Sequence, residues 1–332
     1  MPNNIAQIND LSSLKTTKTL EVSLLLVNIK NSLWLFGIPS WIFGISDRTL
    51  AALADGYLSP IEVLHLFTAS FFFVSWLYLK PQESWIGDEI VPHAPLGNDL
   101  SSTLDQAYFP EAKARMLELQ DKHLIGQEYI LPFHYLCQIY HLLNLKHLET
   151  IHSFSLNNLK VIKANKFQTT PKGGFIQFQT RLDSPFNPLK IWRQPIVEVD
   201  LILHTPYTVE LRIPAHNNKK IIVIFNVLPL GTNQHKFSID IYSDLDWPRP
   251  LLQIVLHFAA GLTLFEDLPY LRKLAERNIH RLFKISNVSQ QETMWLFQRF
   301  VYLYGSQIEY ERSLKTISGE TLTNKLAPVE EK

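Results

Sequence analysis

The sequence predicts an α+β fold in which a curved antiparallel sheet wraps a long C-terminal helix, after an N-terminal extension of short strands and helices. Six segments between residues 159 and 243 alternate in the manner of strands and are separated by turn residues. A proline-rich break then leads into a long amphipathic run over residues 251–278. Consecutive antiparallel strands closed by a helix are typical of an α+β domain, and this shape encloses an apolar cavity, the usual setting of a bulky ligand.

Composition limits the classes of partner and cofactor. The 332 residues carry 31 Lys plus Arg against 31 Asp plus Glu, so no surplus of positive charge indicates a nucleic-acid partner. The single cysteine, Cys137, excludes an internal disulfide, an all-thiolate zinc site and an iron–sulfur cluster held by several thiolates of this chain. The polar first residues do not resemble a secretion signal, so we expect a protein that is not secreted, either cytoplasmic or peripheral on an intracellular membrane.

The N-terminal part alternates between apolar segments and breaks. Residues 19–45 are apolar, β-branched and aromatic, which predicts short strands. Residues 47–79 predict two helices, of which the second begins at a Ser59-Pro60 cap signal. Within 61–79 the uninterrupted apolar part is shorter than the roughly 20 residues that span a bilayer, because Glu62 and His65 lie in the first turns. We therefore expect a buried or surface-docking helix there, with peripheral contact to a membrane through 61–79.

The remaining elements and the domain boundaries follow from changes of period. We expect residues 81–109 to form a connection, a helix to open at Pro110 and run to about Lys122, and a further helix from about Tyr129. A last helix is expected over 290–312. The predicted divisions of the chain are a flexible N-terminus over 1–18, an N-terminal region over 19–125, a ligand-binding domain over 126–315 and a disordered tail over 316–332.

Histidines are concentrated in one segment. Four of the 12 histidines fall within nineteen positions, from His134 to His152, and His147 and His152 frame the sequence HLETIH. Residues five apart on a straight helix point about 140° apart, so this pair converges on one ion only if the helix ends or distorts between them. Taken alone, the pair favours partly buried histidines that are bonded to the backbone.

A carboxylate far along the chain offers a third ligand. Asp267 lies in LFEDLPYL, within the predicted C-terminal helix and among apolar neighbours. Such a carboxylate must be paired, bound to a metal or placed at the surface, and pairing with Arg272 or Lys273 is the alternative interpretation. Two histidines and one carboxylate are the ligand set of non-heme Fe(II) oxygenases.

The order of these motifs resembles a known family. LLNLKHLETIH, residues 142–152, is similar to a helix that carries D-x-x-H-x4-H, LFEDLPYLRKL to a segment with Gln-Asp, and IVIFNVLPLGTNQHKFSIDI to a hairpin with Val-Pro before its turn. Over about residues 125–312 the chain resembles the catalytic domain of Rieske-type non-heme iron oxygenases. The branch with pheophorbide a oxygenase, chlorophyllide a oxygenase and vanillate demethylase is the most similar. The resemblance implies a helix-grip fold, of the START and Bet v1 type.

The resemblance also implies a site. Fe(II) would be bound by His147, His152 and Asp267, Asn144 would take the place of a catalytic Asp, and the substrate would be a hydrophobic ring compound such as a tetrapyrrole. Five aromatic residues are expected to line the substrate site, although each is equally suited to an ordinary core; they are Trp192, Phe225, Phe237, Phe258 and Trp295.

Two departures from the family concern the supply of electrons. The C-x-H and C-x-x-H pairs of a Rieske cluster are missing, so residues 1–125 are either a decayed form of that domain or unrelated to it. Asn144 carries no negative charge and binds a protonated histidine less well than Asp does. Electrons would then come from a separate [2Fe–2S] donor protein, or the chain does not turn over.

Three functions remain open from the sequence. The first, which the three ligand positions favour, is an iron oxygenase-like protein. The second is a non-catalytic protein that binds an apolar ligand or assists assembly in the retained cavity. The third is a structural subunit that docks through 61–79. A phosphate-binding glycine loop, a G-x-S-x-G elbow and an H-E-x-x-H motif are missing, which gives little support to nucleotide, serine-hydrolase or zinc-protease chemistry.

Overall fold

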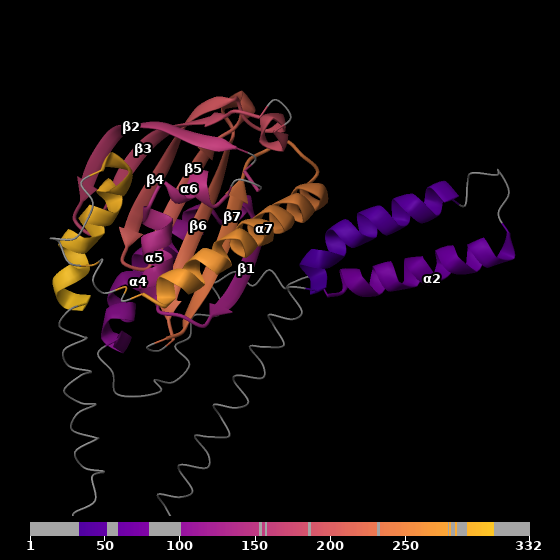
Figure 1. The fold of residues 1–332 in the computed structure, drawn as a ribbon, viewed down its shortest axis with the longest axis horizontal. Helices are drawn as coiled ribbons and strands as arrows, with labels where there is room; N and C mark the ends of the chain where they lie inside the picture. Colours follow the sequence, from indigo (N-terminus) through magenta and orange to yellow (C-terminus); the bar gives the residue numbers. More distant parts are fainter. Residues whose placement is uncertain are drawn as a thin grey trace, which may run out of the picture.

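The fold is that of a computed structural model, which describes most of the chain between residues 33 and 308. The described residues are 33–51, 59–79, 101–152, 155–156, 158–184, 187–230, 233–277, 279, 283 and 291–308. Their main feature is a sheet crossed on one face by a long helix, with a pair of helices that projects from the body (Figure 1). The expected N-terminus over 1–18 and tail over 316–332 lie outside the described residues.

All seven strands of the sheet are antiparallel to their neighbours, in the order β1-β7-β6-β5-β4-β3-β2. The strands are β1 (His123–Leu131), β2 (Leu159–Thr170), β3 (Gly173–Leu182), β4 (Ile196–Thr205), β5 (Thr208–Pro214), β6 (Lys220–Pro229) and β7 (His235–Ser243). The α+β class and the six predicted strands, β2 to β7, are confirmed. The helix expected from Tyr129 is wrong at its start, because this residue lies in β1, which pairs with β7 along its length.

Helices lie on both faces of the sheet. Adjacent strand residues point to opposite faces, and Ile222 and Ile224 of β6 pack against α4 (Ser101–Glu118) while Ile221 and Val223 belong to the main core. That core also contains α5 (Tyr135–Leu143), the long helix α7 (Arg249–Ala275) and the helix over residues 295–308. Short helical turns complete the body; they are η1 (Gln120–Lys122), α6 (His147–Thr150), η2 (Pro188–Ile191), η3 (His216–Asn218) and η6 (Glu292–Met294).

The start of α4 differs from the sequence prediction. The helix expected to open at Pro110 already begins at Ser101, and Pro110 lies inside α4. Proline removes one backbone donor but does not have to end a helix. The long C-terminal helix is confirmed as α7, which begins at Arg249 and runs to Ala275.

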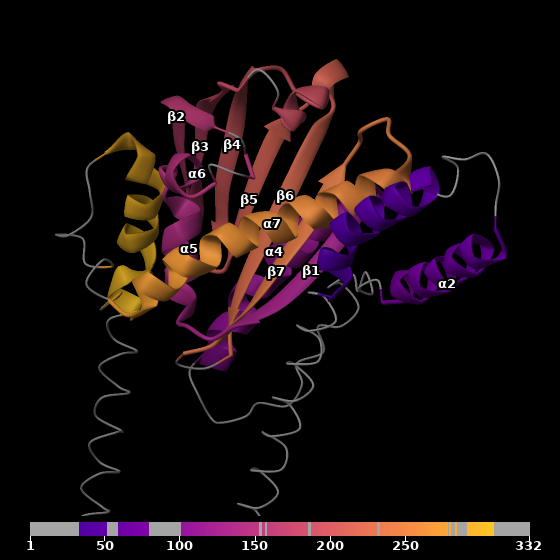
Figure 2. The same ribbon diagram turned by 45° about the vertical axis from the view of Figure 1, so that its right-hand side comes forward.

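The N-terminal extension is a helical hairpin. Residues 33–51 form a helix, so the strands expected over 19–45 are wrong from residue 33 onward, and residues 19–32 lie outside the described part. Apolar β-branched and aromatic residues also occur in a helix when its surface is shielded from water. The second helix, α2 (Pro60–Leu77), begins as predicted at Ser59, whose side chain forms a capping box with Glu62. Figure 2 shows the first helix lying across α7 and both helices extending beyond the body.

Candidate metal centre and its cavity

Three helical elements bring histidines and a carboxylate together. His141 lies on α5, His147 is the first residue of α6, His152 follows the end of α6, and Asp267 lies on α7. Because α6 ends at Thr150, the chain changes direction between the second and third histidine. This is the condition under which histidines five residues apart can converge, so the sequence-predicted set of His147, His152 and Asp267 does meet in space.

The donor atoms converge at short distances. One nitrogen from each of His141, His147 and His152 lies within 4.8 Å of those of the other two. Asp267 Oδ1 is 2.8 Å from His141 Nε2 and 3.2 Å from His152 Nε2. All four side chains are buried, between 0 and 8% exposed as residues. Four donors thus share one enclosed volume.

The contact between His141 and Asp267 is not a hydrogen bond. Their atoms approach to 2.8 Å, yet neither His141 Nε2 nor Asp267 Oδ1 has a hydrogen-bond partner of acceptable geometry among the described residues. Buried polar atoms are almost always satisfied, and an exception requires an explanation such as an ion. Two buried atoms that lie this close without a hydrogen bond between them suit a bound cation, so this donor set fits a metal.

Neighbouring groups fix the orientation of two rings. His147 Nδ1 is 2.7 Å from the backbone carbonyl oxygen of Asn144, to which it can donate. His152 Nδ1 is 3.2 Å from Glu266 Oε2, and Glu266 in turn accepts hydrogen bonds from the backbone N–H and the hydroxyl of Ser155. A ring that donates from Nδ1 keeps the Nε2 lone pair for a metal. Both rings are therefore held in the tautomer that ligation needs.

Burial keeps His141 and His147 neutral and disfavours an ionised Asp267. Desolvation, with a smaller effect of His152, lowers the pKa of His141 to about 3, and desolvation also holds the pKa of His147 well below its ordinary value. Desolvation raises the pKa of Asp267 to about 7, against the opposing effect of His152. The short distances between His141 and Asp267 are therefore not an ion pair. Neutral imidazoles and a carboxylate without a cation are the state that a metal would use.

The alternative interpretation of Asp267 was an exposed acid paired with Arg272 or Lys273. Asp267 is only 8% exposed, and the side chains that its carboxylate approaches are those of His141 and His152, not Arg272 or Lys273. The carboxylate points into the molecule, where the sequence resemblance places a ligand.

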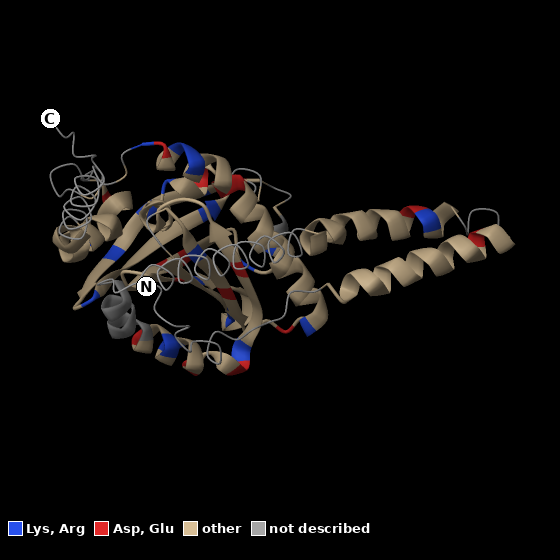
Figure 3. Ribbon diagram, turned by 90° about the horizontal axis from the view of Figure 1, so that it is seen from below, with Lys and Arg blue, Asp and Glu red and all other residues tan. Residues whose placement is uncertain are grey.

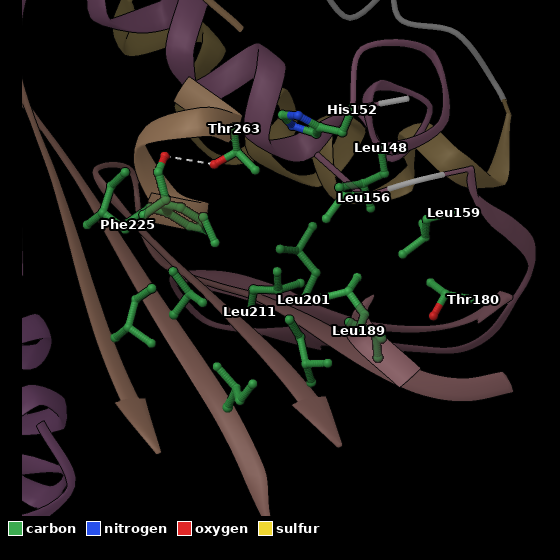
Figure 4. A pocket seen from close by; sticks show the side chains of 18 of the residues that line it. Leu148, His152, Leu156, Leu159, Thr180, Leu189, Leu201, Leu211, Phe225 and Thr263 are labelled. Carbon is green, nitrogen blue, oxygen red and sulfur yellow. Dashed lines mark hydrogen bonds between the residues drawn. The ribbon is translucent and has the colours of Figure 1, made fainter. Parts of the chain in front are cut away.

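An apolar cavity of about 220 Å³ adjoins the cluster, between the sheet and α7. His147, His152 and Asp267 form part of its wall, and leucines such as Leu201 and Leu211 from the sheet form the opposite side (Figure 4). The wall is almost entirely apolar, apart from a few groups that include Thr180 and Arg193. Its polar end is the candidate metal centre.

The five aromatic residues expected in the substrate site divide into two groups. Trp192, Phe225 and Phe237 line the cavity. Phe258 instead packs against the base of the helical hairpin, and the ring of Trp295 contacts Phe167 of β2 at 5.2 Å between centroids. Strand alternation identifies a face of the sheet, but it does not show which helix surfaces will cover that face.

Sequence reasoning did not identify two residues of the centre, and it assigned Asn144 a catalytic side chain, whereas the structure shows its backbone carbonyl orienting His147. His141 and Glu266 were not assigned, although His141 stood in the histidine-rich segment and Glu266 directly precedes Asp267. The Asn144 side chain accepts a hydrogen bond from the backbone N–H of Lys146 at 3.2 Å, and its carbonyl oxygen orients His147. A role of its side chain in catalysis stays a prediction.

Comparisons with known proteins find similarity only among solved structures. No protein-family model matches the sequence, and no curated protein matches it. A quaternary ammonium Rieske monooxygenase is 12% identical, with a TM-score of 0.44, over 62% of this chain and 56% of that one. Dicamba monooxygenase bound to dicamba is 12% identical, with a TM-score of 0.41, over 58% and 59% of the two chains. Pseudomonas putida CBB5 NdmA with caffeine is 15% identical, with a TM-score of 0.37, over 59% and 53%.

The matched region therefore spans a little over half the length of each of these chains. The function of this chain has to be argued from its own site.

Proposed function

We propose that this chain is a mononuclear non-heme iron protein of the oxygenase type that acts on a small apolar ring compound. The observation that supports it is the convergence of four buried donors from His141, His147, His152 and Asp267 without a hydrogen bond between the closest two. Imidazole and carboxylate together suit Fe(II). His147, His152 and Asp267 would hold the ion, with His141 as a fourth donor, and Fe(II) would supply redox chemistry with dioxygen when bound.

The residues around the centre have separate tasks. The Asn144 carbonyl and the Glu266 carboxylate hold protons on Nδ1 of His147 and His152, so that the other ring nitrogens face the centre. The apolar wall excludes water and orients a substrate by shape, with Trp192 and Phe225 as flat surfaces. We propose that α7 and the sheet form a helix-grip arrangement around this substrate.

The size of the cavity favours a small substrate. Its volume of about 220 Å³ is below the roughly 300–1,000 Å³ that is usual for drug-sized ligands. A single or fused ring compound suits this volume better than a tetrapyrrole does. With one cysteine, which is buried in α5, the chain would receive electrons from a separate iron–sulfur protein.

The second candidate is a binding protein for an apolar ligand, without turnover. The nearly continuous apolar wall of the cavity favours it. The two candidates differ in what they need, because the binding protein needs no metal and keeps its ligand when metal is removed.

Metal analysis of the full chain purified without oxygen tests the proposal. We expect about one iron per chain, or one Fe(II) taken up on anaerobic titration. Solvent extraction and mass spectrometry of the same sample would identify a ligand that co-purifies. A chain that carries such a ligand and neither contains nor binds Fe(II) would establish the binding protein instead, and stoichiometric zinc that Fe(II) cannot replace would contradict the iron centre.

A further inference from the structure

The helical hairpin, which we define as residues 33–51 and 59–79, has no role in the proposed iron centre. It is attached to the body at one end only. Leu35 packs against Gly261 of α7, where an added Cβ would lie 2.1 Å from the leucine, and the rings of Trp34 and His257 are 4.8 Å apart. The rest of the hairpin projects from the body, as Figure 1 shows.

The two helices of the hairpin pack against each other near the end that is attached to the body. The rings of Trp34 and Trp76 stack at 5.5 Å, and Trp76 Nε1 donates to the carbonyl oxygen of Trp34 at 3.1 Å. Gly37 allows the close approach, because a Cβ there would lie 2.0 Å from Trp76. Trp41 and Phe73 extend the contact, with ring centroids 5.6 Å apart. The hairpin is therefore a built unit with an apolar interior of its own.

Its outward surface is apolar on all sides. Phe43 is 74% exposed and Phe67 71% exposed, values that are unusual for phenylalanine in contact with water. The other large apolar side chains exposed on the hairpin are Leu33, Phe36, Ile42, Ile45, Leu50, Ile61, Val63, Leu64, Phe71, Phe72, Val74, Leu77, Tyr78 and Leu79. A single stripe would indicate a docking seam for one partner helix, whereas apolar residues around the whole outer circumference indicate a lipid environment.

The polar groups of the hairpin suit the same environment. Charged residues gather at the free end, where Asp47 and Arg48 lie 3.1 Å apart and Glu62 is held in the capping box (Figure 3). Along the apolar length, Ser40, Thr68 and Ser75 each donate to the carbonyl oxygen four residues earlier. Hydroxyls bonded in this way need no water and are tolerated in membrane helices.

The length matches a bilayer. The 18 residues of α2 extend about 27 Å at 1.5 Å per residue, close to the roughly 30 Å of a hydrocarbon core. Two described helices, α2 and α7, are long and apolar enough to cross a membrane. Of the apolar stretch in question, 39% is buried inside the molecule in α7 and 0% in α2. The apolar residues of α7 are explained by its packing in the body, whereas those of α2 have no such contact and suit a lipid environment.

We propose that the hairpin crosses a lipid bilayer, with its charged turn at the far surface and the body on the near side. A shallower insertion would leave Asp47, Arg48 and Glu62 within hydrocarbon, which is costly. In sequence, Lys30 precedes and Lys80 follows the hairpin, whereas Arg48 is the one basic residue within 46–62. This excess of Lys and Arg next to the hairpin favours the cytoplasmic side for the body.

Labelling of a single cysteine tests this topology in the full chain. Cys137 is buried, so Thr49→Cys at the turn and Tyr302→Cys on the body each add one exposed thiol. In inverted bacterial membrane vesicles we expect a membrane-impermeant maleimide to label the body cysteine directly and the turn cysteine only after detergent is added. Full labelling of the turn cysteine without detergent would overturn the proposal.

A flotation assay separates lipid from a second copy of the chain. The purified chain should float with phosphatidylcholine–phosphatidylglycerol vesicles. Asp substitution of both Phe67 and Phe71, at the middle of α2, should lower insertion by at least about 100-fold, whereas Tyr302→Asp on the body should not. Iron binding, measured on the same samples, should be unchanged, so failure here is distinct from failure of the iron centre. A parent chain that is a water-soluble dimer and does not float would overturn the proposal.

Discussion

Two buried carboxylates on opposite sides of the sheet have opposite shifts in pKa. Glu210 of β5 is fully buried and is bonded by Arg115 Nη2 at 3.0 Å, Arg212 Nε at 2.5 Å and His204 Nε2 at 2.7 Å. Burial alone would raise the pKa of Glu210, but the hydrogen bonds from these three residues outweigh it and lower the pKa. Asp267 is also buried and lies beside the imidazoles of His141 and His152, and burial raises its pKa to about 7.

The difference shows what each site is for. At Glu210 the chain supplies its own cations, so the network is complete and stabilises the contact of α4 with the sheet. At Asp267 the described neighbours are imidazoles, so an ionised carboxylate there would need a cation from outside the chain. The first arrangement is structural, and the second fits a site for a cation.

The largest expected effect that distinguishes the Asp267 site from the Glu210 network is the loss of metal when a ligand is substituted. His147→Ala should lower the iron content of the anaerobically purified chain from about one per chain to less than about one tenth, because the affinity for the metal depends on the full ligand set. His204→Ala removes the half-buried histidine of the complete network and should leave the iron content unchanged. Equal iron in His147→Ala and the parent would end the comparison, as it would show that the cluster holds no metal.

The next effect concerns stability at the complete network. Glu210→Gln leaves Arg115 and Arg212 without their carboxylate and should lower the free energy of unfolding by about 3–5 kcal/mol. Because the folded pKa of Glu210 is lowered, its contribution is present above the unfolded value of 4.5 and is lost as pH falls below it. Urea unfolding at pH 7 and pH 4 measures both, and we expect the two chains to differ less at pH 4. Retention of iron by the variant shows that the networks are independent.

Much of the fold was readable because it depends on local pattern. The six strands β2 to β7 have the period of two that a half-buried sheet imposes, and Ser59 with Glu62 is a local cap signal. β1 could not be read in the same way, since its strand state is fixed by pairing with β7 more than a hundred residues later. Residues 33–45 misled for a related reason, because apolar content is shared by buried strands and by helices in an apolar environment.

The sequence allowed the types of ligand at the site to be predicted, but not the full set of residues. His147, His152 and Asp267 could be selected from chemistry and motif order. His141 could not, because its part depends on where α5 ends relative to α6, a matter of backbone direction that residue spacing does not determine. Phe258 shows the reverse error: it lies on α7, but on the side that faces the hairpin.

The pH dependence of an Asp267 variant tests the incomplete site. Since the folded pKa is raised to about 7 from 3.8, the metal-free protein loses stability from this group as pH rises through that interval, at up to about 1.4 kcal/mol per pH unit. Asp267→Asn removes the titration, so the variant should gain stability relative to the parent between pH 4 and pH 7, by a few kcal/mol in all.

Comparison of variant with parent is needed because His141 and His147, whose pKa values are lowered, have the opposite dependence on pH. Asp246→Asn, on an exposed side chain, is the matched control and should show almost no change. A constant difference between Asp267→Asn and the parent across this range would mean that Asp267 stays ionised, in which case the site already holds a compensating charge.

The smallest effects separate the two groups that orient the rings. Glu266→Gln replaces the carboxylate that faces His152 Nδ1 and should weaken Fe(II) binding by about 10–100-fold. Asn144→Asp keeps the backbone carbonyl that faces His147 Nδ1 and changes only a side chain bonded to the N–H of Lys146. An added charge at a partly exposed position is worth less than about 1 kcal/mol, so Fe(II) affinity should change less than about fivefold. A larger change would mean that the side chain itself acts on the ligand, and anaerobic Fe(II) titration of the two variants measures the difference.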